Sequence, residues 1–258
     1  MIETKKMNKN GIFLTFARLA IAFLGTALFS SCSGGANNIN TPKPASTPKA
    51  AATIPPDAPP GAQPPEQMGS PTATVTLEEF ADMQCPSCAN AHPAMNEIKS
   101  MYGSRIHFIF RNFPLQIPAH DKAYEAALAA SAAGMQNKFW DMQNMLFSNQ
   151  KTWSSDPTYK QIWKGYAQKI GLDVAKWETD MGGMGAKNRV EADMARGKAI
   201  PINSTPTLFI NGVSIPYSDM NVNALKTIID AELQKAPGGG AAAPAEKSEG
   251  AKSENSNK

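Results

Sequence analysis

Cysteine and histidine are both scarce in this chain of 258 residues, which contains three of each. Three cysteines are too few for a disulfide-rich scaffold and too few for a metal site with four thiolate ligands. The histidines stand at positions 92, 107 and 120, and these spacings lack the short pairing that is typical of zinc ligands. We therefore expect no metal ion in this protein.

The net charge is low and is confined to one end of the chain. The formal charge is +3, and the N-terminal segment already supplies it, because Lys5, Lys6, Lys9 and Arg18 outnumber Glu3 there. The remaining residues are neutral overall. A nucleic-acid binder that relies on phosphate contacts needs a basic surface, so the sequence predicts no nucleic-acid partner.

The hydrophobic run near the N-terminus is too short to cross a bilayer. It covers only residues 19–29 (LAIAFLGTALF), whereas a hydrocarbon core of about 30 Å needs about 20 apolar residues. The basic residues before the run and the small residues after it are typical of a signal peptide. We expect residues 1–31 to be a signal peptide and the mature protein to be extracytoplasmic.

Cys32 follows this run after two serines. The arrangement resembles a bacterial lipobox, in which the cysteine is acylated and becomes the first mature residue, although Phe29 stands where that pattern usually has leucine. A two-chain lipid anchor attaches a protein stably to a membrane. The sequence therefore predicts lipid attachment at Cys32 and a membrane-anchored lipoprotein of the cell envelope or periplasm. The alternative is an ordinary secreted protein with a stray thiol at this position.

Composition separates the folded part of the chain from its flanks. Half of the 20 prolines lie between positions 41 and 71. Segments that are rich in proline and poor in apolar side chains cannot form a core and behave as extended tethers. We expect a lipid-anchored, proline-rich linker at 32–70, one folded domain at 71–236 and a disordered tail at 237–258.

The folded domain alternates between strand and helix patterns. Residues 72–80 alternate in polarity and are rich in β-branched side chains, and 106–111 (IHFIFR) is a second strand pattern. Asn211 and Gly212, between two short apolar runs, are typical of a hairpin turn. Helices are expected at 86–101, in four or five pieces between 119 and 198, and at 219–235. This order predicts an α/β fold with a mixed sheet covered by helices on both faces.

Two of the cysteines stand in the motif CPSC at residues 85–88, directly after a strand pattern and at the start of a helix pattern. That context is typical of redox chemistry. If Cys85 is the N-cap, Pro86 takes the first helical position, where its missing N–H has no effect. The free N–H groups of Ser87 and Cys88, together with the helix dipole, then stabilise a thiolate on Cys85. Cys88 lies one turn further and can close a disulfide with Cys85.

Two other interpretations of this pair are less favoured. A zinc site would need two further cysteine or histidine ligands. A purely structural disulfide that encloses only two residues would gain little loop entropy. The pair therefore favours a redox site with Cys85 and Cys88 as its catalytic residues.

Four motifs, in order along the chain, carry a resemblance to a known family. They are 78–88 (EEFADMQCPSC), 111–115 (RNFPL), 138–142 (KFWDM) and 204–212 (STPTLFING). The first resembles the active-site strand and motif of the thioredoxin superfamily. The whole region 71–236 is similar to the DsbA-like branch, which includes the BdbD-type thiol-disulfide oxidoreductases. The resemblance implies a thioredoxin-like fold with a helical domain inserted at about 118–200.

The resemblance also implies roles for residues outside the CPSC motif. Pro206 matches a cis-proline that faces the active site, so that the backbone of Thr205 is presented to an extended substrate peptide. Glu79 matches a buried carboxylate beneath the cysteines, which could relay a proton to or from Cys88. By its position alone, Glu79 could instead be a solvated acid at the end of a strand.

Together these features predict an extracytoplasmic thiol-disulfide oxidoreductase that exchanges a Cys85–Cys88 disulfide with protein thiols and oxidises them. Such a protein needs no cofactor, but it needs a redox partner that reoxidises it. A reductase or isomerase of the same fold is an alternative, because Ser87 stabilises a thiolate less than a cationic side chain does. A non-catalytic lipoprotein that serves as a binding module or chaperone is another.

Overall fold

The structure is a computed structural model that describes residues 51–235. The predicted signal peptide, Cys32, the first part of the predicted linker and the predicted C-terminal tail lie outside the described residues. Within 51–235, no helix is both long enough and apolar enough to cross a membrane.

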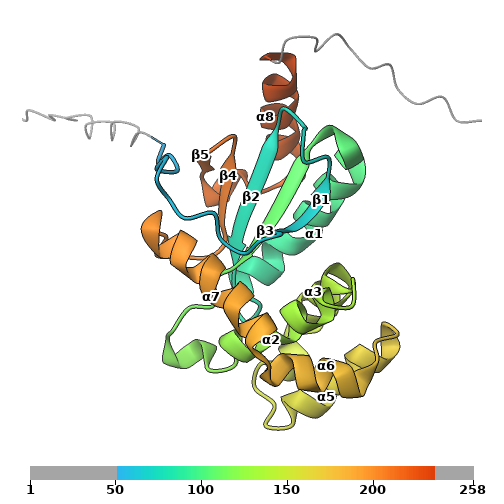
Figure 1. The fold of residues 1–258 in the computed structure, drawn as a ribbon. Helices are drawn as coiled ribbons and strands as arrows, with labels where there is room; N and C mark the ends of the chain where they lie inside the picture. Colours follow the sequence, from blue (N-terminus) through green and yellow to red (C-terminus); the bar gives the residue numbers. More distant parts are fainter. Residues whose placement is uncertain (1–50, 236–258) are drawn as a thin grey trace, which may run out of the picture. The chain divides into compact units, whose positions relative to one another are not determined.

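A five-stranded mixed sheet forms the centre of the domain (Figure 1). Its strands are β1 (Glu66–Gly69), β2 (Thr76–Ala81), β3 (His107–Asn112), β4 (Thr207–Ile210) and β5 (Val213–Ile215), in the order β1-β3-β2-β4-β5. β2 and β3 run parallel and are joined through helix α1 (Pro86–Tyr102), whereas the other neighbours are antiparallel. The expected strands and the hairpin are confirmed, although the first expected strand begins at Thr76.

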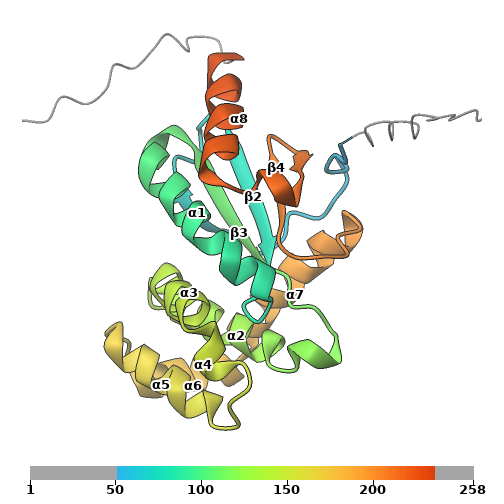
Figure 2. The same cartoon turned by 180° about the vertical axis from the view of Figure 1, so that it is seen from behind.

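Helices cover both faces of the sheet, as the sequence predicts. α1 and α8 (Val222–Lys235) contact each other on one face, in front of the sheet in Figure 2, and α7 (Met184–Ala199) lies against β3 on the other. The remaining α-helices are α2 (Ala123–Gly134), α3 (Phe139–Ser148), α4 (Gln150–Trp153), α5 (Tyr159–Lys169) and α6 (Val174–Gly182). Between β3 and β4 there are six α-helices instead of the four or five expected, because the chain also breaks at Asn149.

β2 is buried on both faces because it lies at the centre of the sheet. Leu77 packs in the core shared with α1, whereas Phe80 packs with Met194 of α7. Neighbouring side chains along a strand point to opposite faces. Glu78 therefore shares the α7 face with Phe80, and Glu79 shares the α1 face with Leu77.

Three tryptophans form the centre of the helical insertion between β3 and β4. Trp153, Trp163 and Trp177 are fully buried or nearly so. The indole N–H of Trp153 donates to the carbonyl of Leu146 at 2.8 Å, and that of Trp177 donates to the carbonyl of Ala129 at 2.9 Å. The apolar core of the insertion is continuous with the core between the sheet and α1. The insertion is thus packed firmly against the part of the domain that carries the CPSC motif.

The predicted boundary between linker and domain at residue 70 is wrong, because residues 51–70 are part of the fold. β1 pairs with β3, Thr53 forms a bridge with Val213, and Gly61 and Ala62 are buried. We call residues 51–70 the strap, because they cross the sheet from its β5 edge to the opposite edge, where β1 pairs with β3 (Figure 1).

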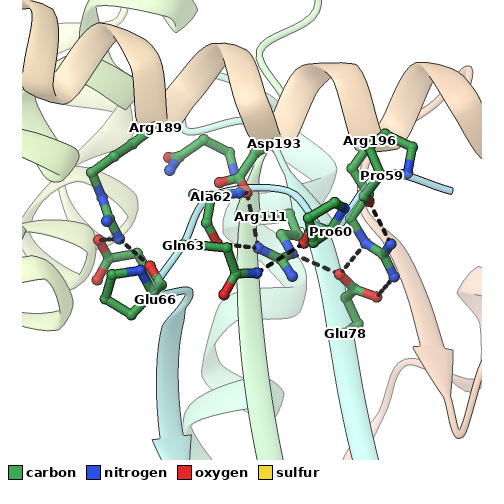
Figure 3. Close-up of polar contacts among 12 residues, drawn as sticks. Pro59, Pro60, Ala62, Gln63, Glu66, Glu78, Arg111, Arg189, Asp193 and Arg196 are labelled. Carbon is green, nitrogen blue, oxygen red and sulfur yellow. Dashed lines mark hydrogen bonds and ion pairs between the residues drawn. The ribbon is translucent and has the colours of Figure 1, made fainter.

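Charged side chains on one face of α7 bind the strap (Figure 3). Arg189, Asp193 and Arg196 are four and three residues apart, which places them on the same side of the helix. Arg189 Nη2 contacts the Pro64 carbonyl (2.9 Å), Asp193 Oδ1 the Ala62 amide (2.9 Å) and Arg196 Nη1 the Pro59 carbonyl (2.8 Å). Proline lacks the backbone donor but keeps its carbonyl acceptor, so arginine side chains can hold a proline-rich segment that composition alone assigns to a tether.

Beneath the strap, four charged side chains form a buried network. Arg111 contacts Glu78 (Nε–Oε1 2.6 Å) and Asp193 (Nη1–Oδ1 3.1 Å), and Arg196 contacts Glu78 (Nη2–Oε2 2.7 Å). Burial raises the pKa of Asp193 in spite of Arg111. At Glu78 the effect of burial is outweighed by the two arginines, which hold the pKa of that carboxyl below its usual range. The two cations and two carboxylates compensate one another where a single buried charge would be strongly destabilising.

Candidate active site

Cys85 is the N-cap of α1, and Pro86 is its first helical residue, as the sequence predicts. The backbone of Cys85 is extended, with φ −71° and ψ 121°, which is usual for an N-cap. Its sulfur makes no hydrogen bond of regular capping geometry. Nevertheless, the backbone N–H groups of Cys88 and Ser87 contribute to lowering the pKa of Cys85.

The two thiols are both free and differ in burial: Cys85 is 6% exposed, and Cys88 is completely buried. The hydrogen bond with the Cys88 side chain is the largest cause of a low Cys85 pKa, and it outweighs burial, so that the pKa falls to about 5. Burial raises the pKa of Cys88 well above its ordinary value, and the adjacent Cys85 sulfur adds to that rise. The site therefore holds one thiolate and one protonated thiol.

The loop before β4 closes the site from the other side. The Thr205–Pro206 peptide bond is cis, as the resemblance implies. Sγ of Cys85 lies 3.3 Å from the carbonyl oxygen of Thr205, to which it donates a hydrogen bond when it is protonated. The hydroxyl of the exposed Tyr217 donates to the carbonyl of Ser87 at 3.4 Å. The structure thus brings Ser87, Thr205 and Pro206 together around Cys85.

Glu79 is buried in β2 with 4% of its surface exposed, so the alternative of a solvated acid at a strand end is wrong. Its neighbours across the sheet are Phe110 of β3 and Leu208 of β4. Burial raises the pKa of Glu79 to about 7, although the positive charge of Lys99 opposes this shift. A carboxyl group that titrates near neutral pH can both donate and accept a proton.

Lys99 of α1 is a partner of Glu79 that no sequence motif marks. Burial lowers the pKa of Lys99 to about 8, and the charge of Glu79 opposes this shift. The ammonium group lies over the rings of Phe108 and Trp140, 5.0 and 4.5 Å from their centroids. These aromatic faces stabilise the cation at a half-buried position.

Asp82, at the end of β2, is a second buried acid to which the sequence assigns no role. Its Oδ2 accepts hydrogen bonds from the Leu115 amide (2.9 Å) and from His120 Nδ1 (2.7 Å), and its Oδ1 accepts one from the Gln84 amide (2.7 Å). The carboxylate therefore ties the loop that leads to Cys85 to the start of the insertion. The signal in the sequence is an acid placed directly after a buried strand.

The other two histidines each connect two elements of the fold. His92 of α1 is hydrogen-bonded to Asn144 of α3 (Nε2–Oδ1 2.7 Å), and His107 of β3 is hydrogen-bonded to Gln67 of β1 (Nε2–Oε1 2.7 Å). Among residues 51–235, no group of three or more His, Cys, Asp and Glu side chains is placed to hold a metal ion. The described histidines thus serve as contacts between elements.

Solved structures with a similar fold include BdbD and a thiol-disulfide exchange protein. Oxidised BdbD from Bacillus subtilis matches with a TM-score of 0.60 and 22% identity, over 72% of this chain and 100% of that chain. The thiol-disulfide exchange protein α-DsbA2 from Wolbachia pipientis matches with a TM-score of 0.55 and 17% identity, over 65% and 86%. At these identities the likeness concerns the fold, which is thioredoxin-like with a helical insertion.

Among curated sequences, the Na(+)/H(+) antiporter NhaA 1 of Mycolicibacterium gilvum is 35% identical over 146 residues, which are 56% of this chain and 23% of the relative. The chain thus spans about a quarter of the length of the curated relatives that it matches. A family model described as thioredoxin matches residues 63–231, which include the sheet, the CPSC motif and the insertion. Because this match covers more than half of the chain, the protein belongs to the thioredoxin family.

Proposed function

We propose that this protein is an extracytoplasmic thiol-disulfide oxidoreductase that oxidises the thiols of other proteins. The observation that carries the proposal is the unequal pair of sulfurs at the start of α1. Cys85 caps the helix and keeps some exposed surface, whereas Cys88 is completely buried. Only one sulfur of a Cys85–Cys88 disulfide is then open to attack by a substrate.

In the first step, a substrate thiolate attacks Sγ of Cys85 in the enzyme disulfide. A bond forms between the substrate sulfur and Cys85, the Cys85–Cys88 bond breaks, and Cys88 takes the electron pair and then a proton. We assign the delivery of that proton to Glu79, whose buried carboxyl has a pKa of about 7. Among the described residues, Glu79 makes no direct hydrogen bond with either sulfur, so the assignment rests on its burial and its pKa.

In the second step, the second thiolate of the substrate attacks the substrate sulfur of the mixed disulfide. The substrate disulfide forms, and Cys85 leaves as a thiolate. A thiol with a low pKa is the better leaving group, and the Cys85 pKa of about 5 makes it one. Two electrons pass from the substrate to the enzyme, so a redox partner must later remove them.

The low pKa of Cys85 favours the oxidation of substrates over their reduction. A stabilised thiolate stabilises the reduced enzyme, and this makes the enzyme disulfide a stronger oxidant. A reductase or isomerase needs a Cys85 thiolate that is stabilised less, so that its disulfide is a weaker oxidant. The carbonyl of Thr205 lies beside Cys85, and this placement of backbone next to the attacked sulfur supports a peptide substrate, because an extended peptide binds through backbone hydrogen bonds.

Oxidative refolding of a reduced, unfolded test protein tests this function. We expect the disulfide form of the wild type to introduce disulfides and the Cys85→Ser variant to be inactive. Reduced Cys88→Ser, mixed with the disulfide form of the test protein, should accumulate mixed disulfides: the Cys85 thiolate attacks a substrate disulfide, one substrate sulfur leaves as a thiolate, and no buried thiol remains to displace the substrate from Cys85. Cys85→Ser is the matched control and should trap almost none.

Reduction of insulin is the opposite assay and separates the alternatives. A protein that reduces insulin rapidly but does not oxidise the test protein would be a reductase. A protein that is inert in both assays, and whose cellular role survives Cys85→Ser, would be a binding module or chaperone. Either result would overturn the proposed oxidation.

We also propose that the protein is a lipoprotein attached to the membrane through Cys32. The support comes from the sequence, in which a basic start and a short hydrophobic run end at that cysteine. Cys32→Ala should move the protein from the membrane to the soluble extracytoplasmic fraction. Wild-type protein recovered in the soluble fraction without an acyl chain would contradict the anchor.

A further inference from the structure

The loop from Asp82 to Cys85, which leads from β2 to α1, satisfies only part of its own backbone. The Cys85 amide donates to the Asp82 carbonyl at 3.1 Å, and the Gln84 amide donates to the Asp82 carboxylate at 2.7 Å. The carbonyl of Met83, within this turn, needs a donor from elsewhere. Buried carbonyls in proteins almost always have one.

Gln150, the first residue of α4, supplies that donor. Its side-chain Nε2 donates to the carbonyl of Met83 at 2.9 Å and to the carbonyl of Cys85 at 3.0 Å. The Cys85 carbonyl also accepts from the Ala89 amide at 3.1 Å, the first backbone hydrogen bond of α1. Gln150 is only 7% exposed, so water does not readily replace the two hydrogen bonds.

Gln84 makes the reverse connection, from the loop into the insertion. Its Nε2 donates to the carbonyl of Ser154 (3.1 Å) and to the carboxylate of Asp121 (3.0 Å), and its Oε1 accepts from the amide of Lys122 (2.7 Å). Ser154 directly follows α4, and Gln150 begins it. Gln150 of α4 thus binds the active-site loop, and Gln84 of the loop binds the residue that follows α4. Together the two amide side chains fix this short helix against the loop.

We propose that Gln150 is a positioning residue for Cys85, a role that rests on the proposed redox function. The Gln150 amide holds the carbonyls on both sides of Gln84 and so fixes the orientation of the first turn of α1. That turn presents the N–H groups that stabilise the Cys85 thiolate. Without the amide, the turn relaxes, the thiolate loses part of this stabilisation, and the enzyme disulfide becomes a weaker oxidant.

The test uses Gln150→Met in the full chain, because methionine keeps the length of glutamine and removes both donors. Two properties are measured: the Cys85 thiolate pKa, from absorbance at 240 nm against pH, and the equilibrium constant of the enzyme with glutathione. We expect the Cys85 pKa to rise and the oxidising equilibrium constant to fall by about three- to tenfold, since one pKa unit corresponds to a factor of ten. If this variant does not fold, Gln150→Glu is measured instead and should shift both properties in the same direction.

Gln143→Met is the matched control. Gln143 is also a buried amide of the insertion, in α3, and its Oε1 has no hydrogen-bond partner among the described residues. This variant should leave the Cys85 pKa and the glutathione equilibrium unchanged even if its melting temperature moves. An unchanged pKa and equilibrium constant in a folded Gln150 variant would overturn the positioning role. A wild type that fails the refolding assay would overturn the proposed function instead and leave this comparison intact.

Discussion

At the scale of single residues, the site depends on a difference between two identical side chains three positions apart. The hydrogen bond between the two side chains is the largest cause of the low Cys85 pKa, whereas burial is the largest cause of the high Cys88 pKa, to which that hydrogen bond adds. Burial enlarges the difference, because a completely buried sulfur is costly to ionise. Because the start of α1 leaves Cys85 partly exposed and buries Cys88, the substrate attacks Cys85 in the first step and Cys88 is the sulfur that leaves.

His92, one turn after Cys88, makes stability depend on pH. Its ring lies against Phe147, 4.7 Å between centroids, and burial, with a contribution from Lys99, lowers its pKa to about 4. Below about pH 6.5 the unfolded chain binds a proton at His92 that the folded chain does not bind. The contribution of His92 to the free energy of unfolding is therefore complete above pH 6.5 and is lost as the pH falls to 4. Between pH 6.5 and pH 4 we expect the free energy of unfolding of the wild type to fall by on the order of 2 kcal/mol more than that of His92→Gln.

Urea unfolding of both proteins at pH 7, 5.5 and 4 measures this difference. The amide of His92→Gln can still contact Asn144 but does not titrate. The variant therefore shows how stability depends on pH when the His92 imidazole is absent. Parallel pH profiles for the two proteins would mean that His92 titrates alike in the folded and unfolded states.

Single residues could be predicted from the sequence only where a motif or a resemblance marks them. Cys85 and Cys88 follow from their spacing, and Glu79 and Pro206 from the resemblance. Lys99 and Gln150 could not be predicted, because nothing local distinguishes a lysine on a helix or a glutamine at a helix start. Their importance arises from contacts across the fold, such as the one between Gln150 and Met83, 67 positions apart.

At the scale of elements, α7 holds both the sheet and the strap through one charged face. Asp193 accepts hydrogen bonds from the amides of Ala62 and Asn112 and from Arg111. Asp193→Asn keeps the size of the side chain but removes the charge that compensates Arg111. We expect a loss of about 3 kcal/mol in the free energy of unfolding, since breaking a buried charge network leaves one charge without its partner.

Glu191→Gln, on the same helix, is the control for this variant. Glu191 is exposed, and its polar partners among residues 51–235 are Lys187 and the Tyr124 hydroxyl. An exposed ion pair contributes little, so the control should change stability by less than about 0.5 kcal/mol. Equal effects of the two substitutions in urea unfolding would contradict the assigned role of the network.

The elements with local signals are those the sequence predicts well. The hairpin turn is an example, because Asn211 and Gly212 both have positive φ angles, 47° and 78°, as such turns require. The strap has no local signal. Its order comes from Arg189, Asp193 and Arg196, more than a hundred positions later in the chain, and composition cannot reveal such partners.

At the scale of the whole molecule, the strap belongs to the domain and should contribute to its stability. A chain that begins at residue 71 lacks β1 and the Ala62 backbone groups that satisfy Asp193 and Arg111. Each buried charged group left without a partner costs roughly 1–3 kcal/mol. We expect this chain to melt roughly 10 °C below a chain that begins at residue 51, or not to fold.

Thermal unfolding of the two truncated chains gives the comparison directly. The length difference is only the strap, so the two proteins share the CPSC motif, the insertion and the C-terminal helix. Equal melting temperatures would show that residues 51–70 are only a tether, as their composition suggests.

The pKa of Cys85 in the reduced wild-type protein is the measurement that tests the redox site most directly. Rates of alkylation by iodoacetamide between pH 3 and 9, with the modified residue identified by mass spectrometry, report it. We expect Cys85 to be labelled with a transition near pH 5 and Cys88 to be spared throughout. A transition near the free-thiol value of about 8.5, or equal labelling of both cysteines, would contradict the unequal pair on which the proposed function rests.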